Sequence, residues 1–287
     1  KEFLKLIDFS IKLKKQNRTG KQKLLLKNKT LAMIFEKPST RTRVSFEVGI
    51  LQLGGHAINL PLQQMQHSRG ESAEDTAKTL SRYVDVIAIR AYEHNFIEEL
   101  ANHSTIPVIN GLSNSYHPCQ TLADLMTIKE YKKKFKDLKI AWIGDGNNVC
   151  NSLIFGCSKT QIQISIATPK GFEPNSDVVK NASKHTTIDL TTNPELAVRD
   201  ADVVMTDTFV SIHDSDAKSK KFMPTFQVNA SLMNKAKDNA IFMHCLPAKR
   251  GYEVTNSVID GPQSVVWDEA ENRLHTQKAL LGSLLSI

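Results

Sequence analysis

The chain has 287 residues, of which 40% are hydrophobic and 23% are charged, and its formal net charge is +7. This composition is that of a globular protein and excludes a disordered chain, while the length suits two domains of ordinary size. The longest apolar runs have the length of a strand, so the sequence predicts no membrane span and no membrane partner. Only 7% of the residues are aromatic and most lysines are scattered. A basic surface or an anionic small substrate therefore explains the charge as well as nucleic acid does.

The four cysteines, Cys119, Cys150, Cys157 and Cys245, form no CxxC pair and have no zinc-ligand spacing. The simplest interpretation is a set of reduced thiols in the cytoplasm, without a metal site. The first fifteen residues are amphipathic, carry Asp8, and lack the apolar core and cleavage site of a signal peptide.

Apolar runs and amphipathic stretches alternate along the first half of the chain. After an N-terminal helix, we expect strands at 31–35, 56–62, 85–91 and 107–110, and helices from 43 onward, at 71–83, at 93–103 and at 119–135. The lysine-rich end of the last of these helices, residues 129–137, is the predicted domain boundary.

The second half repeats the alternation. We expect strands at 139–143, 162–167, 187–190, 202–206, 240–244 and 264–267, and helices at 149–159, 177–184, 194–200, 230–237 and 269–285. The last helix has an apolar side that includes Leu274, Leu280 and Leu284. The prediction is an α/β protein with two doubly wound parallel-sheet domains, residues 1–132 and 133–269, linked by interdomain helices, with a C-terminal helix (270–287) that packs back on the first domain.

Polar residues follow the first predicted strand. Ser39, Thr40, Arg41 and Thr42 stand between that strand and a helix. A helix N-terminus favours anions because its first N–H groups have no intrahelical partner, and an arginine adds a planar fork of donors. Ser39 could instead be a plain helix cap. Because the carboxyl ends of parallel strands bind ligands in open α/β sheets, we favour an anion site.

Further polar residues lie after other strands of the first half. Arg90 ends one strand, and His117 and Gln120 lie about one helical turn apart at the start of a helix. A histidine before proline at a helix N-terminus is kept neutral and can donate an N–H to a carbonyl oxygen. Together with Ser39–Thr42 these residues predict a pocket for a phosphate joined to a polarised carbonyl.

The second half offers weaker signals. The sequence GDGNN at 144–148 lacks the third glycine of a dinucleotide loop, so a nicotinamide-dependent dehydrogenase is a distant alternative. Cys245, in HCLP at 244–247, is either a reactive thiol or a small buried residue. Glu269, Glu271 and Arg273 have the character of ordinary helix-start charges.

Taken together, these motifs resemble the aspartate/ornithine carbamoyltransferase superfamily, and its ornithine branch in particular. The resemblance covers nearly the whole chain and rests on six segments in order: STRTR at 39–43, HPCQ at 117–120, GDGNN at 144–148, DTFVS at 207–211, HCLP at 244–247 and EAENR at 269–273. The cysteine in HCLP is what points to the ornithine branch.

The resemblance implies a role for each matching residue. Ser39, Thr40, Arg41 and Thr42 would hold the phosphate of carbamoyl phosphate, and Gln66 would assist, reaching the site of a neighbouring subunit in a homotrimer. Arg90, His117 and Arg273 would bind the carbonyl oxygen and stabilise the oxyanion, Gln120 would take the carbamoyl amide, and the Leu246 carbonyl would contact the reacting group.

The ornithine side is implied in the same way. Asn148, Asp207, Ser211 and Ile212 would bind ornithine, while Cys245 with Asp207 would orient its δ-amine and help it lose a proton. The implied reaction is direct attack on carbamoyl phosphate, giving citrulline and phosphate in arginine biosynthesis. It proceeds through a tetrahedral intermediate, with no covalent enzyme intermediate, no metal and no organic cofactor.

One segment departs from the family pattern. Where the ornithine loop usually reads Ser-Met-Gly, this chain has Ser211, Ile212 and His213. Isoleucine is stiffer than methionine, and histidine lacks the conformational freedom of glycine. Putrescine and N-acetylornithine are therefore the alternative acceptors. A nucleic-acid-binding protein and a nicotinamide-dependent enzyme are much weaker alternatives.

Overall fold

The structure is a computed structural model, and it describes residues 2–209 and 220–285. The chain divides into two compact units. Unit 1 comprises Lys1–Met126 and Glu271–Ile287, and unit 2 comprises Thr127–Ala270. Helices α5 (Pro118–Lys132) and α12 (Val266–Leu285) each contain one of the boundaries between the units.

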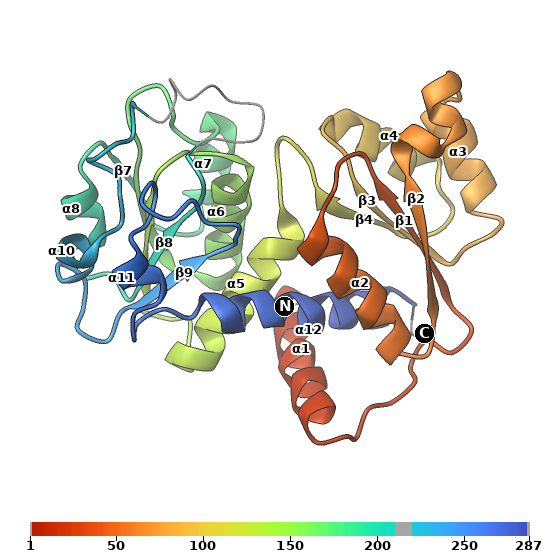
Figure 1. Cartoon of the computed structure of the whole chain (residues 1–287), viewed down its shortest axis with the longest axis horizontal. Coiled ribbons are helices and arrows are strands. Elements are labelled where there is room, and N and C mark those ends of the chain that lie inside the picture. The colour runs from red at the N-terminus through yellow and green to blue at the C-terminus, as the bar shows by residue number, and fades with distance from the viewer. Residues whose placement is uncertain (1, 210–219, 286–287) are drawn as a thin grey trace. The chain divides into compact units, whose positions relative to one another are not determined.

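Unit 1 contains a parallel sheet of four strands in the order β2-β1-β3-β4 within the described chain. Its elements in sequence order are α1 (Glu2–Arg18), β1 (Thr30–Phe35), α2 (Thr40–Gln52), β2 (His56–Pro61), the short helices η1 (Leu62–Gln64) and η2 (Gln66–Arg69), α3 (Ala73–Leu80), β3 (Val86–Arg90), α4 (His94–His103) and β4 (Val108–Leu112). Side chains alternate across β1. Leu31 and Met33 pack with Phe46 of α2 and Leu281 of α12, whereas Ile34 packs with residues of α3 and α4. Helices therefore cover both faces of the sheet (Figure 1).

Unit 2 contains a parallel sheet of five strands in the order β7-β6-β5-β8-β9, again counting described residues. Its elements are β5 (Lys139–Ile143), α6 (Asn148–Thr160), β6 (Gln163–Ala167), α7 (Ser176–Ala182), β7 (Ile188–Thr191), α8 (Pro194–Val198), β8 (Val203–Thr206), α10 (Ala230–Met233), β9 (Ile241–His244) and α11 (Asn256–Ile259). Ala141, Val204 and Phe242 on one face of the sheet pack against α8, α10 and α11. These three helices lie on one side of the strands and α6 and α7 on the other (Figure 1).

The predicted fold class is confirmed: each unit is a doubly wound sheet in which every pairing is parallel. No helix among those the structure describes has both the length and the apolar character needed to cross a bilayer.

The predicted strand at 264–267 is wrong. Ser264 forms only an isolated bridge with Phe242, and α12 already begins at Val266. Branched and aromatic residues suggested a strand there, but Asp268 and Glu269 in the first turn suit the positive end of a helix dipole.

Helix α12 buries a polar side in addition to part of the expected apolar side, since Leu280 still packs against the core of unit 1. Leu284 is 43% exposed, whereas Asn272, Arg273, His275, Thr276, Gln277 and Lys278 are each 3% exposed or less. The Lys14 ammonium donates to Asn272 Oδ1 at 2.7 Å, and the Lys278 ammonium donates to Gln52 Oε1 at 2.8 Å. Polar side chains of α1 and α2 thus pair with Asn272 and Lys278 on the buried polar side of α12.

Candidate active site

Unit 1 gathers its predicted site residues at one edge of its sheet. Strand β1 lies between β2 and β3, so the chain leaves β1 toward one side and later returns on the other. The loops after Phe35 and Arg90 therefore meet at the carboxyl ends of neighbouring strands. Ligands bind at such switch points in doubly wound sheets.

Ser39 stands at the N-cap position of α2, but its hydroxyl does not cap the helix. Instead, Arg90 Nη1 donates to Ser39 Oγ at 3.0 Å, which brings the end of β3 to the start of α2. The first-turn N–H groups of α2, from Thr40 onward, point out of the end of the helix that this guanidinium contacts through Ser39. Their partial positive charge and the arginine both attract an anion.

A second arginine reaches the same helix from α12. Arg273 Nη2 donates to Thr42 Oγ1 at 3.1 Å, and its Nη1 donates to Gln120 Oε1 at 2.7 Å. All three side chains are 3% exposed or less. Because charge-assisted hydrogen bonds in a buried place are strong, this arginine ties α2, α5 and α12 together beside the anion site.

His117 is buried where these cations converge. Burial lowers the pKa of its imidazole well below the usual value, and the charges of Arg273, Arg90 and Arg41 lower it further. The ring is therefore neutral at physiological pH, and a neutral imidazole can donate an N–H to a carbonyl oxygen without bringing another positive charge.

Gln66 is not part of this cluster. It is exposed at the start of η2, and its side chain makes no hydrogen bond within the described ranges 2–209 and 220–285. Of the predicted residues of unit 1, the structure brings together Ser39, Arg41, Thr42, Arg90, His117, Gln120 and Arg273, with Thr40 in the same first turn, and leaves out Gln66.

Unit 2 has a switch point of the same kind. Strand β5 lies between β6 and β8, and β9 follows β8 in the sheet. The segments after Ile143, Thr206 and His244 therefore emerge at one edge, although they are far apart in sequence. These segments carry Asn148, Asp207 and Cys245.

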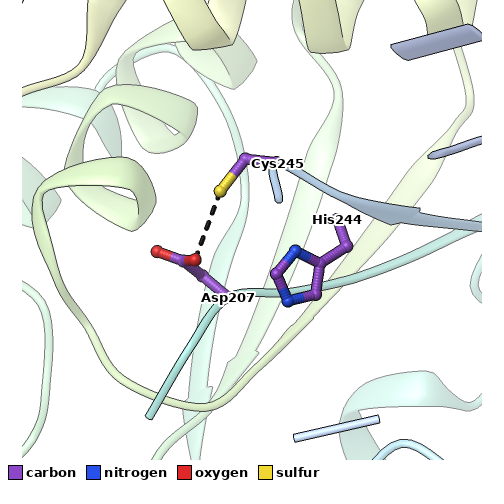
Figure 2. Close-up of side chains that lie close together, drawn as sticks. All are labelled: Asp207, His244 and Cys245. Carbon is purple, nitrogen blue, oxygen red and sulfur yellow. Dashed lines mark hydrogen bonds between the residues drawn. The ribbon is translucent and has the colours of Figure 1, made fainter. Parts of the chain in front are cut away.

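The Asp207 carboxylate lies at this edge and faces the Cys245 thiol (Figure 2). Its Oδ1 accepts from Cys245 Sγ at 3.2 Å and from the Thr208 backbone N–H at 2.7 Å, and its Oδ2 accepts from Asn147 Nδ2 at 2.8 Å. Both Asp207 and Cys245 are partly exposed. Donors on two sides fix the carboxylate at the surface, where it can receive a cationic amine.

Asn147, the neighbour of the predicted Asn148, also belongs to this edge, and the sequence analysis did not name it. Asn147 is the N-cap of α6, where its Oδ1 accepts from the N–H groups of Val149 and Cys150, while its amide nitrogen holds Asp207. Asn148 is the first residue of that helix. An asparagine at a strand-to-helix turn is a typical cap, and this signal could have separated the two asparagines.

The glycines of GDGNN are explained by packing. A Cβ on Gly146 would lie 2.2 Å from the Pro174 nitrogen. Gly144 has φ of +130°, and a Cβ there would lie 2.9 Å from the Phe209 ring. The close approach of other segments of the same chain and the positive φ of Gly144 require glycine at these two positions. No dinucleotide is needed to explain them.

Beneath Cys245 lies a fully buried network that sets the course of the backbone. The His244 backbone N–H donates to Glu269 Oε2 at 2.9 Å, and His244 Nε2 lies 3.1 Å from Glu253 Oε1. His244 Nδ1 accepts from the Leu246 N–H at 2.9 Å, so the ring hydrogen is on Nε2 and is donated to Glu253. Leu246 has φ of +56°, an unusual value for a residue other than glycine, and this network holds it there.

Asp207, His244 and Cys245 have ligand atoms within 4.8 Å of one another, the spacing of a metal site. The two ring nitrogens of His244 already bond Leu246 and Glu253. A metal at this place would have to displace one of these buried bonds, so the residues do not fit a resident ion well. That the site works without a metal stays a prediction. Ser211 and Ile212 lie outside the described residues.

The chain is similar to known proteins along almost its whole length. A family profile described as the aspartate/ornithine carbamoyltransferase carbamoyl-P binding domain matches residues 1–130, and one described as the Asp/Orn binding domain matches residues 136–284. The chain is 59% identical to the ornithine carbamoyltransferase of Cenarchaeum symbiosum over 99% of this chain and 94% of the relative. It is 50% identical to that of Methanocaldococcus jannaschii, with 97% and 93% coverage.

Solved structures agree. Ornithine carbamoyltransferase from Pyrococcus furiosus superposes with a TM-score of 0.95 at 50% identity, covering 99% of this chain and 93% of that one. The Thermus thermophilus enzyme gives a TM-score of 0.91 at 40% identity, with 99% and 94% coverage. With both domain profiles matched in order and relatives similar along almost their whole length, the chain belongs to the aspartate/ornithine carbamoyltransferase family.

Proposed function

We propose that this chain transfers the carbamoyl group of carbamoyl phosphate to the δ-amine of L-ornithine, giving L-citrulline and phosphate. The observation that carries the proposal is the contact between Cys245 and Asp207 at the carboxyl ends of β9 and β8. In a chain of this family it supplies a thiol and a carboxylate side by side for an amine substrate. An acceptor with a second carboxylate, such as aspartate, would be repelled by Asp207.

Unit 1 is proposed to bind carbamoyl phosphate. The first turn of α2, Ser39–Thr42, would hold the phosphate through backbone N–H groups, hydroxyls and the Arg41 guanidinium. Arg90, His117 and Arg273 would act on the carbonyl oxygen, and Gln120 would accept from the carbamoyl amide. The buried, neutral state of His117 supports the role of a hydrogen-bond donor to an uncharged oxygen.

Unit 2 is proposed to bind ornithine. Asp207 would attract the cationic end of the substrate, and Cys245 would orient the δ-amine once it is neutral; Asn148, Ser211 and Ile212 would hold the other end. An alkylamine is protonated at neutral pH and has no free electron pair, so the site must select the neutral form before attack. The Leu246 carbonyl would contact the reacting group.

The chemistry follows from these groups. The amine nitrogen adds to the carbonyl carbon, and charge develops on the carbonyl oxygen, where Arg90, His117 and Arg273 stabilise it. The tetrahedral intermediate collapses with release of phosphate, whose charge is held by the turn at Ser39–Thr42. The mechanism calls on no metal, no organic cofactor and no covalent bond to the enzyme.

The wider setting is also proposed. The division into a carbamoyl-phosphate domain and an ornithine domain follows the descriptions of the two matched profiles, and a place in arginine biosynthesis follows from the product. Four free cysteines favour the reducing cytoplasm. We further propose a homotrimer in which Gln66, exposed in its own subunit, reaches the site of a neighbour.

The experiment is a colorimetric citrulline assay with carbamoyl phosphate and four separate acceptors: ornithine, putrescine, N-acetylornithine and aspartate. Turnover with ornithine alone is expected. Efficient turnover of putrescine or N-acetylornithine would reassign the acceptor, and no ureido product from any of the four would overturn the function.

Two arginines of α2 provide a matched pair of variants for this assay. Arg41→Ala should lower kcat/KM by about a hundredfold or more, because it removes a charge at the phosphate. Arg43→Ala should leave kcat/KM nearly unchanged, since Arg43 is exposed and pairs only weakly with Glu47 at 3.8 Å. Equal losses in the two variants would contradict the proposed phosphate site.

A further inference from the structure

A buried carboxylate stands behind the predicted amide-binding residue. Gln120 Nε2 donates to Asp124 Oδ1 at 2.8 Å, while Gln120 Oε1 accepts from Arg273 Nη1 at 2.7 Å. Asp124 is 0% exposed, Gln120 1% and Arg273 3%. Asp124 and Gln120 lie four residues apart on α5, so one turn of helix fixes their separation.

The chemistry of the two neighbours allows only one orientation of the Gln120 amide. The Arg273 guanidinium can only donate hydrogen bonds, and Asp124 Oδ1 accepts one from Gln120 Nε2. The amide nitrogen must therefore face Asp124 and the amide oxygen must face Arg273. A flipped amide would set N–H against N–H on one side and oxygen against oxygen on the other.

We propose that Asp124 is a positioning residue that orients Gln120. The oriented amide then selects carbamoyl phosphate over other acyl phosphates, such as acetyl phosphate. The inference rests on the proposed function. The amide oxygen has a second lone pair beyond the one used by Arg273, and this acceptor meets the NH₂ of a carbamoyl group. Acetyl phosphate carries a methyl group at that place and offers no donor. Asp124 itself does not touch the substrate.

The same arrangement strengthens the acceptor. Donation from Arg273 to the oxygen and acceptance by Asp124 from the nitrogen both shift amide electrons toward the oxygen, and hydrogen bonds in such a chain reinforce one another. Without the carboxylate, the observed orientation leaves a buried NH₂ group lacking this acceptor, which is costly. The side chain would then turn toward other acceptors, including the substrate's own oxygens.

The test compares two phosphates in Asp124→Leu and Asp124→Asn. The readout is the Ki of acetyl phosphate, as a competitive inhibitor, divided by the KM of carbamoyl phosphate. Both constants are independent of the fraction of enzyme that is folded, so partial loss of stability leaves the ratio interpretable. Asp124→Ala serves in the same assay if the leucine variant does not accumulate as folded protein.

Asp124→Leu should lower the ratio by about tenfold, the worth of one buried hydrogen bond. Asp124→Asn keeps an acceptor for Gln120 and should hold the ratio within about threefold of the parent. The control is Thr121→Val on the same helix: Thr121 is 4% exposed, its hydroxyl has no hydrogen-bond partner in the described chain, and the substitution should leave the ratio unchanged.

Two results would overturn the inference. One is an unchanged ratio in the leucine or alanine variant despite a lower thermal midpoint, which would make Asp124 purely structural. The other is an equal fall in the ratio in Thr121→Val, which would show that any disturbance of α5 has this effect. A parent enzyme without citrulline formation would instead defeat the proposed function, so the two failures are distinguishable.

Discussion

Cys245 differs from the other three cysteines in being partly exposed, and thiol chemistry should reveal it. Cys119, Cys150 and Cys157 are buried. Burial raises the pKa of Cys119 to about 11 and that of Cys150 well above its usual value, so neither forms a thiolate at neutral pH. We expect iodoacetamide to modify Cys245 first in the folded protein, because the thiolate is the reactive form and buried thiols are inert.

The measurement is peptide mass spectrometry after a short labelling time. Cys245→Ser should abolish the rapid phase, and ornithine with phosphate should slow it in the parent if Cys245 lies against the acceptor. Labelling of Cys119 or Cys150 at a comparable rate in folded protein would contradict the expectation.

His117 should make the protein less stable in mild acid. Its folded-state pKa lies well below the ordinary 6.5, first because of burial and then because of Arg273, Arg90 and Arg41. Below pH 6.5 the unfolded chain takes up a proton that the folded chain refuses, so the free energy of unfolding falls as pH falls toward the folded-state pKa. Above 6.5 neither state is protonated and this contribution is flat.

His117→Asn removes the group, and the fall in unfolding free energy between about pH 7.5 and 5.5 should be smaller in the variant by up to about 1.4 kcal/mol for each pH unit below 6.5. Urea titrations at several pH values measure it. His275, whose pKa burial also lowers, contributes equally to both proteins and cancels in the difference. A steeper fall in the variant would show that the sign is wrong.

Several candidate site residues could be predicted from the sequence, because they directly follow predicted strands. Ser39 and Arg90 were proposed as site residues from their place after apolar runs, whereas the roles of Asp207 and Cys245 came from the family resemblance. The contact of Asn147 with Asp207 was not predicted, because it depends on the residue at which α6 begins. Asp124 was not predicted, because its spacing of four from Gln120 has meaning only once Arg273 is known to lie on the other side of the Gln120 amide.

Among elements, the turn after β9 depends most on buried polar groups. Glu253 and His244 are both 0% exposed, and Glu253 Oε1 also accepts from the Lys249 N–H. Glu253→Ala leaves buried donors without their acceptor. We expect it to lower the free energy of unfolding by about 1–3 kcal/mol and to reduce kcat, since Leu246 and Cys245 lose their support.

Glu195→Ala is the control within the same unit. Glu195 is 58% exposed in its ion pair with Lys235, and its removal should change stability by less than about 1 kcal/mol. Urea titration and citrulline formation measure the two effects. If the two glutamate variants were equally stable and equally active, the buried network would have no role in shaping the turn.

Helices and strands were predicted well where the hydrophobic periodicity was strong, whereas the residues at which they begin and end were predicted less accurately. The strands of both sheets lie within one or two residues of expectation, because long apolar runs bounded by polar turns leave little choice. The segment 264–267 failed because its β-branched residues favour a strand locally, whereas Glu269 gains a buried hydrogen bond to the His244 N–H in the helix. Such a tertiary contact is invisible in local propensity.

At the scale of the molecule, alternation of strands and helices predicted two doubly wound sheets, and it also predicted where each would bind. In both units the candidate residues lie where strand order reverses, at β1 and β3 in one and at β5 and β8 in the other. The carboxyl ends of parallel strands share one edge irrespective of the side chains, so this edge could be predicted from the pattern, whereas the strand order could not. Contacts between copies of the chain leave no such pattern.

Exposed apolar residues on α2 and β2 nevertheless favour association. Val44 is 50% exposed, Leu51 63% and Ile58 46%. Apolar residues that gather on neighbouring elements, as α2 and β2 are, mark an interaction surface, whereas single exposed apolar residues do not. We expect a homotrimer of about three times 32.1 kDa in light scattering, and Leu51→Glu should shift the mass toward the monomer.

Sharing of sites between subunits can be tested by mixing two inactive variants. Gln66→Ala and His117→Ala should each be nearly inactive alone, the first because a neighbour loses a phosphate ligand and the second because its own site loses a donor. If Gln66 acts in the neighbouring site, a hybrid trimer contains some sites with both defects and some with neither. Unfolding and refolding a one-to-one mixture should then restore about a quarter of the parent activity. If Gln66 acted within its own subunit, every site would keep one defect and the mixture would stay as inactive as its components.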